Sequence, residues 1–245
     1  MSKLIPAPRW LTSRPLAHRG YHDIKSGRAE NSLSAFQAAI DAGFGIECDL
    51  QISSTGEPVV FHDPLLGRMT GIDGKVRDFS PKDLSNFQLA ETGDCIAKLS
   101  SHLALVADKV PVVLELKGID GDNSALVQGV AEALMPYEGQ VAVMSFNHEI
   151  CSQFRNLLPN IPRGLTAEGD ETYYEIHHQA MEKFDLHFVS YEVREIDCRF
   201  VHDMRALGIP IISWTVRDDH TRKLSEQHAD QMTFEGFDPR VEQSG

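Results

Sequence analysis

The chain lacks any apolar run of about 18 residues, the length that crosses a bilayer, and its first fifteen residues contain no apolar stretch of signal-peptide length. We therefore expect no stable membrane insertion. Cysteine is sparse, and no Cys-x-x-Cys pair occurs, which excludes a zinc knuckle and a thioredoxin-type motif. The four cysteines are Cys48, Cys95, Cys151 and Cys198. Scattered, reduced thiols without a signal segment predict a cytoplasmic protein.

Positive charge is also scarce. The sequence has 23 Lys and Arg against 36 Asp and Glu, which gives a formal net charge of −13. This surplus repels polyanions and anionic lipid surfaces unless a basic patch offsets it, and the sequence shows no such patch. We expect no nucleic-acid partner. A small-molecule substrate that carries phosphate would have to be held by local cations, either side chains or a bound metal.

The length and the order of elements favour a single α/β barrel. From Pro15 onward, short β-rich runs alternate with longer helical patterns, as in βα units around a parallel sheet. We expect one catalytic domain over residues 1–245 with the TIM-type (β/α)8 fold. The predicted strands are residues 16–18, 45–51, 58–62, 110–117, 141–146, 162–167, 186–191, 210–216 and 230–234.

Two departures from a regular barrel are expected. Residues 53–57 are too short for a parallel crossover, so they predict a tight turn between antiparallel strands. A turn centred on Thr55 and Gly56 would set Asp49 opposite His62. Residues 64–109, rich in Gly, Asp and Ser, predict a small insertion over one end of the barrel. Asn31 is the expected N-cap of the helix that precedes the second strand.

Carboxylates recur on one face of two predicted strands. The period-two geometry of a strand directs Glu47 and Asp49 away from the apolar face and into the barrel. Glu115 and Lys117 alternate in the same way on a later strand. Three inward carboxylates would form an all-oxygen site suited to Mg²⁺ or Ca²⁺. The alternative is that these acids form buried salt bridges with Arg19 and Lys117.

Two histidines stand at predicted strand ends, where barrel enzymes keep their chemistry. His18 and His62 could serve as an acid and a base, because imidazole titrates near neutrality. Arg19 is suited to clamp a phosphate, and Lys117 could offset its developing charge. The alternative for each histidine alone is a surface residue or a satisfied core residue.

Several short motifs, taken in order and spacing, resemble the glycerophosphodiester phosphodiesterase family over about residues 15–235. The motifs are residues 16–20 (LAHRG), 30–32 (ENS), 46–49 (IECD), 58–64 (PVVFHDP) and 115–117 (ELK). Residues 66–76 resemble the family's insertion after the His-Asp pair, and residues 213–216 (SWTV) resemble its late strand. Ser32 replaces a family threonine, and Glu235 follows a last strand that commonly ends in Thr-Asp.

The resemblance implies a phospholipase-C-like phosphodiesterase architecture and a role for each matching residue. It implies His18 and His62 as the acid and base pair, Glu47, Asp49 and Glu115 as metal ligands, and Arg19 and Lys117 as phosphate contacts. Glu30 would support the site, or be a surface acid near a helix start. Trp214 would line the substrate pocket, or be a core residue.

The implied reaction is metal-dependent hydrolysis of glycerophosphodiesters to glycerol 3-phosphate and an alcohol, with Mg²⁺ or Ca²⁺ as cofactor. The attacking oxygen belongs either to water or to the neighbouring glycerol hydroxyl. One alternative is a phosphodiesterase that acts on lysophospholipids or other phosphodiesters. Another is a non-catalytic barrel that binds a phosphorylated ligand.

Overall fold

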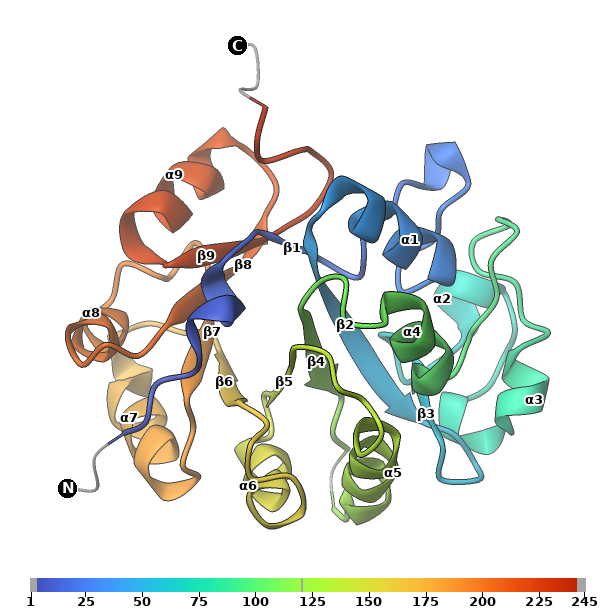
Figure 1. Cartoon of the computed structure of the whole chain (residues 1–245), viewed down its shortest axis with the longest axis horizontal. Helices are drawn as coiled ribbons and strands as arrows, with labels where there is room; N and C mark the ends of the chain where they lie inside the picture. The colour runs from blue at the N-terminus through green and yellow to red at the C-terminus, as the bar shows by residue number, and fades with distance from the viewer. Residues whose placement is uncertain (1–3, 120, 242–245) are drawn as a thin grey trace. The chain divides into compact units, whose positions relative to one another are not determined.

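The computed structural model describes residues 4–119 and 121–241, and the chain divides into two compact units. One unit comprises Met1–His18 and Ala142–Gly245, and the other comprises Arg19–Val141. Figure 1 labels the elements of both. Within the described residues, the strands are β1 (Leu16–Ala17), β2 (Gly45–Ile52), β3 (Pro58–Val60), β4 (Val112–Leu116), β5 (Val141–Ser145), β6 (Arg163–Ala167), β7 (Phe188–Glu192), β8 (Ile211–Val216) and β9 (Gln231–Phe234). Every predicted strand is confirmed, with no boundary moved by more than two residues.

The first unit, residues 1–18 and 142–245, is built on parallel strands in the order β1-β9-β8-β7-β6-β5. In Figure 1 the longer helices of this unit lie on one side of these strands. Apolar side chains of β6, β7 and β8 form a buried cluster with Phe200 and Met204 of α8 (Arg199–Ala206). The helical segments of this unit are η1 (Arg9–Thr12), α6 (His148–Leu157), η4 (Glu171–Tyr173), α7 (Tyr174–Lys183), α8 (Arg199–Ala206) and α9 (Asp219–His228).

The second unit, residues 19–141, is centred on β2, which pairs parallel with β4 and antiparallel with β3. The helices α1 and α4 pack together beside β2 and β3, and α5 contacts both strands. The helical segments of this unit are η2 (Ile24–Ser26), α1 (Leu33–Ala42), α2 (Gly67–Thr70), η3 (Val76–Asp78), α3 (Pro81–Leu84), α4 (Leu99–Val106) and α5 (Ser124–Leu134). Among the described residues of the whole chain, no helix combines the length and apolar character needed to cross a bilayer.

The predicted hairpin between β2 and β3 is present, but its register differs by one residue from the prediction. Leu50 pairs with Val60, and the Phe61 N–H donates to the Asp49 carbonyl oxygen. Asp49 is therefore opposite Phe61 and not His62. The turn is closed by the Ser53 N–H, which donates to the Glu57 carbonyl, so it is centred on Thr55 alone. Gly56, with φ 84°, supplies the left-handed residue that this turn needs.

The segment predicted as an insertion forms its own apolar cluster in the second unit. Leu66, Met69, Val76 and Leu84 pack with Val59 of β3. One of the short helices of this segment, α3, has a side-chain cap. In α3, Ser80 and Asp83 form a reciprocal capping box around Pro81. The segment thus rests on the hairpin that ends at His62.

The prediction that Asn31 is the N-cap of α1 is wrong, because the N-cap is Ser32. The Ser32 hydroxyl accepts a hydrogen bond from the Ala35 N–H. Asn31 has a φ of 58°, a left-handed conformation that few residues other than glycine adopt. This conformation turns Asn31 away from the cap position and frees its side chain for another role, described below.

His102 of α4 is a buried histidine whose environment predicts a pH-dependent stability. Its Nδ1 lies 3.0 Å from the Lys98 carbonyl oxygen and its Nε2 lies 3.2 Å from the Asn31 carbonyl oxygen. Burial lowers the pKa of His102 to about 4, against the smaller opposing effect of the two carbonyls. The folded chain therefore keeps His102 neutral, while the unfolded chain protonates it below its ordinary pKa of about 6.5.

We expect the stabilisation due to neutral His102 to be complete above pH 6.5 and to be lost as the pH falls toward 4. The loss should approach about 3 kcal/mol, because each pKa unit corresponds to about 1.4 kcal/mol. The test is the free energy of unfolding, measured by urea denaturation across this range, for the native chain and His102→Gln. The variant should show a shallower pH dependence, whereas His220→Gln, an exposed control, should follow the native curve. Parallel curves for the native chain and His102→Gln would contradict the assignment.

Candidate active site

Three carboxylates that the sequence directed inward meet in the second unit. Glu47 and Asp49 lie on β2, and Glu115 lies on β4 directly opposite Asp49 in the strand register. Each offers an oxygen that lies within 4.8 Å of the oxygens offered by the other two. All three residues are buried, with 2%, 1% and 7% of their surface exposed. The period-two prediction for this group is confirmed.

Burial and mutual repulsion oppose ionisation of this cluster. Burial, followed by the charges of Asp49 and Glu115, raises the pKa of Glu47 well above its ordinary value. Burial and Asp49 also raise the pKa of Glu115, against the opposing charge of Lys117. A group of like charges held this close in a low-dielectric site requires cations to keep it ionised at neutral pH.

Two side-chain cations contact the cluster, so the salt bridges that the sequence left as an alternative are also present. Lys117 Nζ lies 2.7 Å from Glu115 Oε1 and 3.0 Å from Asp49 Oδ1. Burial alone would lower the pKa of Lys117, but Asp49 and Glu115 outweigh it and raise the pKa above its ordinary value. Arg19 Nε lies 3.3 Å from Asp49 Oδ2, and the Arg19 N–H donates to Glu47. Arg19 and Lys117 thus lower the cost of ionising the cluster, as a bound divalent ion would also do.

The donor set fits a hard divalent ion. It consists of carboxylate oxygens alone, drawn from two rigid neighbouring strands, and such ligands suit Mg²⁺ or Ca²⁺ better than zinc. Glu47, Asp49 and Glu115 would hold the ion.

Asn31 is a site residue that the sequence analysis assigned to a different role. Its Nδ2 donates to Asp49 Oδ2 over 2.8 Å, and its Oδ1 accepts from the Asp49 N–H over 3.2 Å. These two bonds fix the orientation of a candidate metal ligand. The unusual backbone of Asn31 aims the amide at Asp49, and the adjacent Ser32 takes the capping role. Each residue of the Glu-Asn-Ser motif thus has a separate role. Glu30 contacts Arg19, Asn31 orients Asp49, and Ser32 caps α1.

Glu30 joins Arg19 to the candidate catalytic histidine of this unit. Glu30 Oε1 lies 2.8 Å from Arg19 NH1 and 2.6 Å from NH2 of Arg68, whose Nε lies 2.5 Å from Asp63 Oδ2. Asp63 Oδ1 in turn lies 2.6 Å from His62 Nδ1. Burial would raise the pKa of both acids, but their arginine partners, together with His62 at Asp63, lower them. The role of Arg68 was not predicted, because only the folded chain brings its side chain to Glu30 and Asp63.

His18 has an equivalent arrangement in the first unit. Its Nδ1 lies 2.7 Å from Glu235 Oε2, and the same oxygen lies 2.9 Å from NH2 of Arg217. Although burial would raise the pKa of Glu235, His18 and Arg217 lower it to about 2. Glu235, which the sequence analysis identified as a departure in the last strand, is thus a charged partner of His18. Each candidate histidine faces a carboxylate that an arginine holds ionised.

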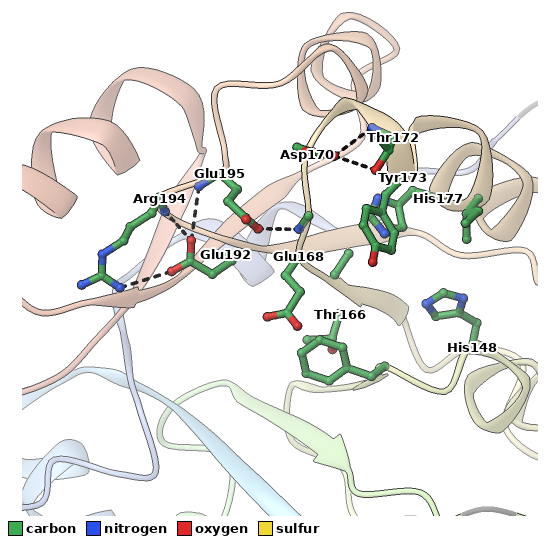
Figure 2. A pocket seen from close by; sticks show the side chains of 14 residues that line it. His148, Thr166, Glu168, Asp170, Thr172, Tyr173, His177, Glu192, Arg194 and Glu195 are labelled. Carbon is green, nitrogen blue, oxygen red and sulfur yellow. Dashed lines mark hydrogen bonds and ion pairs between the residues drawn. The ribbon is translucent and has the colours of Figure 1, made fainter.

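A cavity of about 820 Å³ lies at the carboxyl ends of β5, β6 and β7 in the first unit (Figure 2). Its charged lining is mostly acidic, with Glu168, Asp170, Glu192 and Glu195 against Arg194. Arg194 NH1 lies 3.6 Å from Glu192 Oε1, and the Arg194 and Glu195 N–H groups donate to the other oxygen of Glu192. In Figure 2 the Glu168 side chain extends from the end of its strand toward the side of the cavity where Thr166 lies.

Aromatic side chains border the same cavity. Phe146 lines it and is 45% exposed. Trp214 of β8 lies edge-on to Phe146, with ring centroids 5.6 Å apart, and its Nε1 donates to the Ser190 carbonyl. Trp214 thus supports a lining residue, while the predicted direct contact of Trp214 with substrate stays a prediction.

Comparison with known proteins gives consistent results. Residues 18–236 match the sequence model of the Glycerophosphoryl diester phosphodiesterase family. A glycerophosphodiester phosphodiesterase of Caldanaerobacter subterraneus subsp. tengcongensis is 28% identical over 221 residues, which cover 82% of this chain and 84% of the relative. A glycerophosphodiester phosphodiesterase of Bacillus altitudinis is 33% identical over 156 residues, 59% of this chain and 62% of the relative.

The solved structures bear on the fold. A phosphodiesterase of Oleispira antarctica, solved with the product sn-glycerol-3-phosphate, has a TM-score of 0.81 at 24% identity and covers 90% of this chain and 92% of its own. A Silicibacter pomeroyi structure described as a putative glycerophosphoryl diester phosphodiesterase has a TM-score of 0.77 at 20% identity, with 96% of this chain and 90% of its own covered. The predicted TIM-type (β/α)8 fold is confirmed.

We expect Asn31→Gly to weaken Mg²⁺ or Ca²⁺ binding by about 10- to 100-fold, the usual cost of removing a hydrogen-bond partner of a metal ligand. Glycine keeps the left-handed backbone available, so the variant removes the amide and little else. Isothermal titration with each ion would measure the change. Gln37→Ala, a half-buried position on α1 whose amide donates to Asp41, is the control and should bind normally. Unchanged affinity in Asn31→Gly would show that Asp49 is not a ligand oriented by Asn31.

Proposed function

The chain belongs to the Glycerophosphoryl diester phosphodiesterase family, and on this premise we propose that it hydrolyses glycerophosphodiesters to glycerol 3-phosphate and an alcohol. We further propose that the reaction depends on a divalent cation and on a pair of histidines. The observation that carries the proposal is the cluster of three buried carboxylates on β2 and β4, whose oxygens lie close together and contact Arg19 and Lys117. Such a cluster is costly to bury unless it binds a cation.

Glu47, Asp49 and Glu115 would hold Mg²⁺ or Ca²⁺. The bound ion would supply positive charge to a phosphate oxygen and so lower the barrier to attack at phosphorus. Arg19 and Lys117 carry side-chain N–H groups suited to the remaining phosphate oxygens. Both already contact Asp49, so a phosphate bound there would share these cations with the acid.

His18 and His62 would move the protons. With Nδ1 directed at a carboxylate, each ring donates from Nδ1 and presents Nε2 as the nitrogen that exchanges protons. One ring would take the proton from the attacking oxygen, and the other would give a proton to the departing alkoxide. The attacking oxygen is that of water or of the neighbouring glycerol hydroxyl. Asp63 and Glu235 would act as positioning residues.

We propose that the released alcohol is small and polar, and that the cavity in Figure 2 receives it. Barrel enzymes bind substrates at the carboxyl ends of their strands, and this cavity lies at the ends of β5, β6 and β7. A carboxylate beside an exposed phenyl ring suits an ammonium group, through charge attraction and cation–π contact. The acidic lining is unsuited to the acyl chain of a lysophospholipid. The cytoplasmic location expected from the sequence stays a prediction.

A substrate panel tests the reaction. We expect turnover of glycerophosphocholine with Mg²⁺ or Ca²⁺, complete loss of activity with a chelator, and recovery when either ion is restored. His18→Ala and His62→Ala should lower kcat by about 10²- to 10⁴-fold with the fold intact, which is the usual share of acid–base catalysis. The exposed control His220→Gln should keep full activity.

Several outcomes of this panel would count against the proposal. Turnover that persists in chelator would reject metal dependence. Full activity in both histidine variants would reject the acid–base pair. Saturable binding of the diester without any product would favour the non-catalytic barrel, and preferential turnover of a lysolipid would favour the lipid-acting alternative.

We expect Glu168→Gln to lower kcat/KM for glycerophosphocholine by about 3- to 10-fold, the value of one partly exposed ion pair. The kcat/KM for glycerophosphoglycerol, whose head group is uncharged, should stay unchanged. Glu149→Gln, an exposed position on α6 outside the cavity lining, is the matched control. An equal effect of Glu168→Gln on both substrates would show that Glu168 does not recognise a cationic head group.

A further inference from the structure

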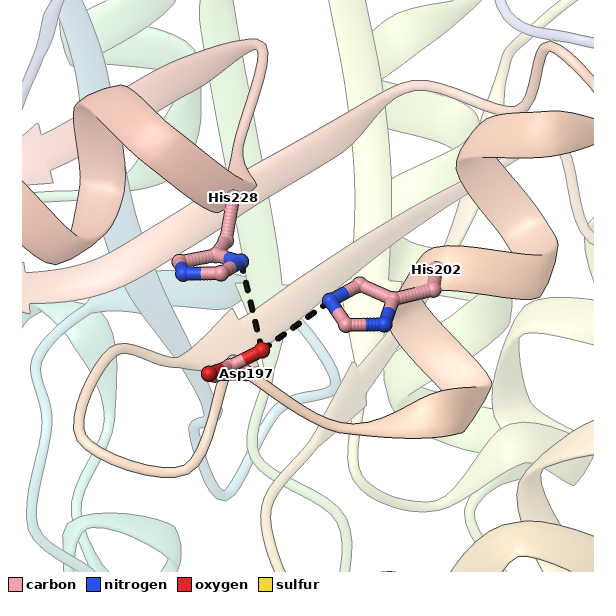
Figure 3. Close-up of side chains that lie close together, drawn as sticks. All are labelled: Asp197, His202 and His228. Atoms are coloured by element: carbon pink, nitrogen blue, oxygen red, sulfur yellow. Dashed lines mark ion pairs between the residues drawn. The ribbon is translucent and has the colours of Figure 1, made fainter.

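Three potential metal ligands meet in the first unit on elements that carry none of the three carboxylates of the proposed hard-ion site (Figure 3). Asp197 lies in the connection between β7 and α8, His202 lies in the second turn of α8, and His228 is the last residue of α9. Figure 3 shows both imidazole rings directed at the same carboxylate. Three separate elements thus place one oxygen and two ring nitrogens together.

The distances match those of a small tetrahedral ion. His202 Nε2 lies 3.1 Å from Asp197 Oδ1, and His228 Nδ1 lies 3.5 Å from the same oxygen. An ion bound at about 2.0–2.1 Å to nitrogen and oxygen ligands needs those ligands about 3.3 Å apart. All three ligand atoms lie within 4.8 Å of one another. A small change of side-chain rotation would therefore seat the ion.

The chemistry of this group differs from that of the carboxylate cluster. Two imidazoles with one carboxylate suit a borderline ion such as Zn²⁺, whereas oxygen ligands alone suit Mg²⁺ or Ca²⁺. His228 also stands at the carboxyl end of α9, where the helix dipole favours positive charge. The side chains of Asp197 and His202 are 62% and 52% exposed, so an ion could enter from solvent and keep water as a further ligand.

We propose that Asp197, His202 and His228 form a second metal site, which binds Zn²⁺ or a similar borderline divalent ion. The bound ion would tie α8 to the end of α9 and thereby stabilise the first unit. The site is distinct from the proposed hard-ion site in residues, elements and ligand type. A surface ion pair among the three side chains is the competing explanation.

Zn²⁺ titration of the purified chain, with Mg²⁺ in excess, tests this site. The native chain should bind one more equivalent of Zn²⁺ than His202→Gln or His228→Gln, and in Asp197→Asn that equivalent should bind at least about 10- to 100-fold more weakly. His220→Gln, on the same helix as His228, is the matched control and should bind like the native chain. Zn²⁺ should also raise Tm in the native chain and the control, but less in the three variants.

The comparison separates this site from other zinc binding. Zinc that occupies the carboxylate cluster or another histidine would be retained in all variants, so only the difference between the variants and the control matters. Equal stoichiometry, affinity and Tm response in the native chain, His202→Gln and His228→Gln would overturn the proposal and leave an ion pair only. Asp197, His202 and His220 are exposed, and His228 is half-buried at the end of α9. These substitutions are therefore expected to leave the fold intact.

Discussion

The second unit is organised around three acids that the strand geometry forces together. Asp49 and Glu115 are register partners on parallel strands, and Glu47 lies two residues away on the same face. Because these acids are buried, water screens their repulsion poorly, and Asp49 contacts Arg19, Lys117 and the Asn31 amide. The need to neutralise these acids explains why Arg19, Lys117 and Asn31 converge on one point.

The two histidines show a second regularity, which no single motif reveals. His62 faces Asp63, which Arg68 holds, and His18 faces Glu235, which Arg217 holds. In each case the arginine keeps the carboxylate ionised, so the carboxylate can fix the ring tautomer without taking the proton. Both histidine rings are thus held by an ionised carboxylate. Asp63 directly follows His62 in the sequence, whereas Glu235 is far along the chain from His18.

The sequence predicted the parts that depend on local periodicity. Alternation along β2 and β4 was sufficient to predict that Glu47, Asp49 and Glu115 meet on one face, because a strand has only two faces. The sequence did not predict the hairpin register, because a change of one residue in the turn length shifts every pair of residues across the two strands. It also missed the role of Asn31, whose left-handed backbone cannot be deduced from residue type alone. Arg68 and Arg217 were missed because long side chains reach partners that only the tertiary fold brings near.

The shared cations have a consequence for the order of binding under the proposed function. Arg19 and Lys117 are engaged by the acids, so a phosphate that enters without a metal meets carboxylates whose charge is not fully offset. A divalent ion held by Glu47, Asp49 and Glu115 would make the local charge more positive. Arg19 and Lys117 would then be less occupied by the acids and could attract the phosphate more strongly. Metal and phosphate should therefore favour each other's binding, with the same coupling free energy in both directions. The chain has a net charge of −13, which repels an anionic phosphodiester. A local positive charge at the metal site would attract the phosphodiester to this point.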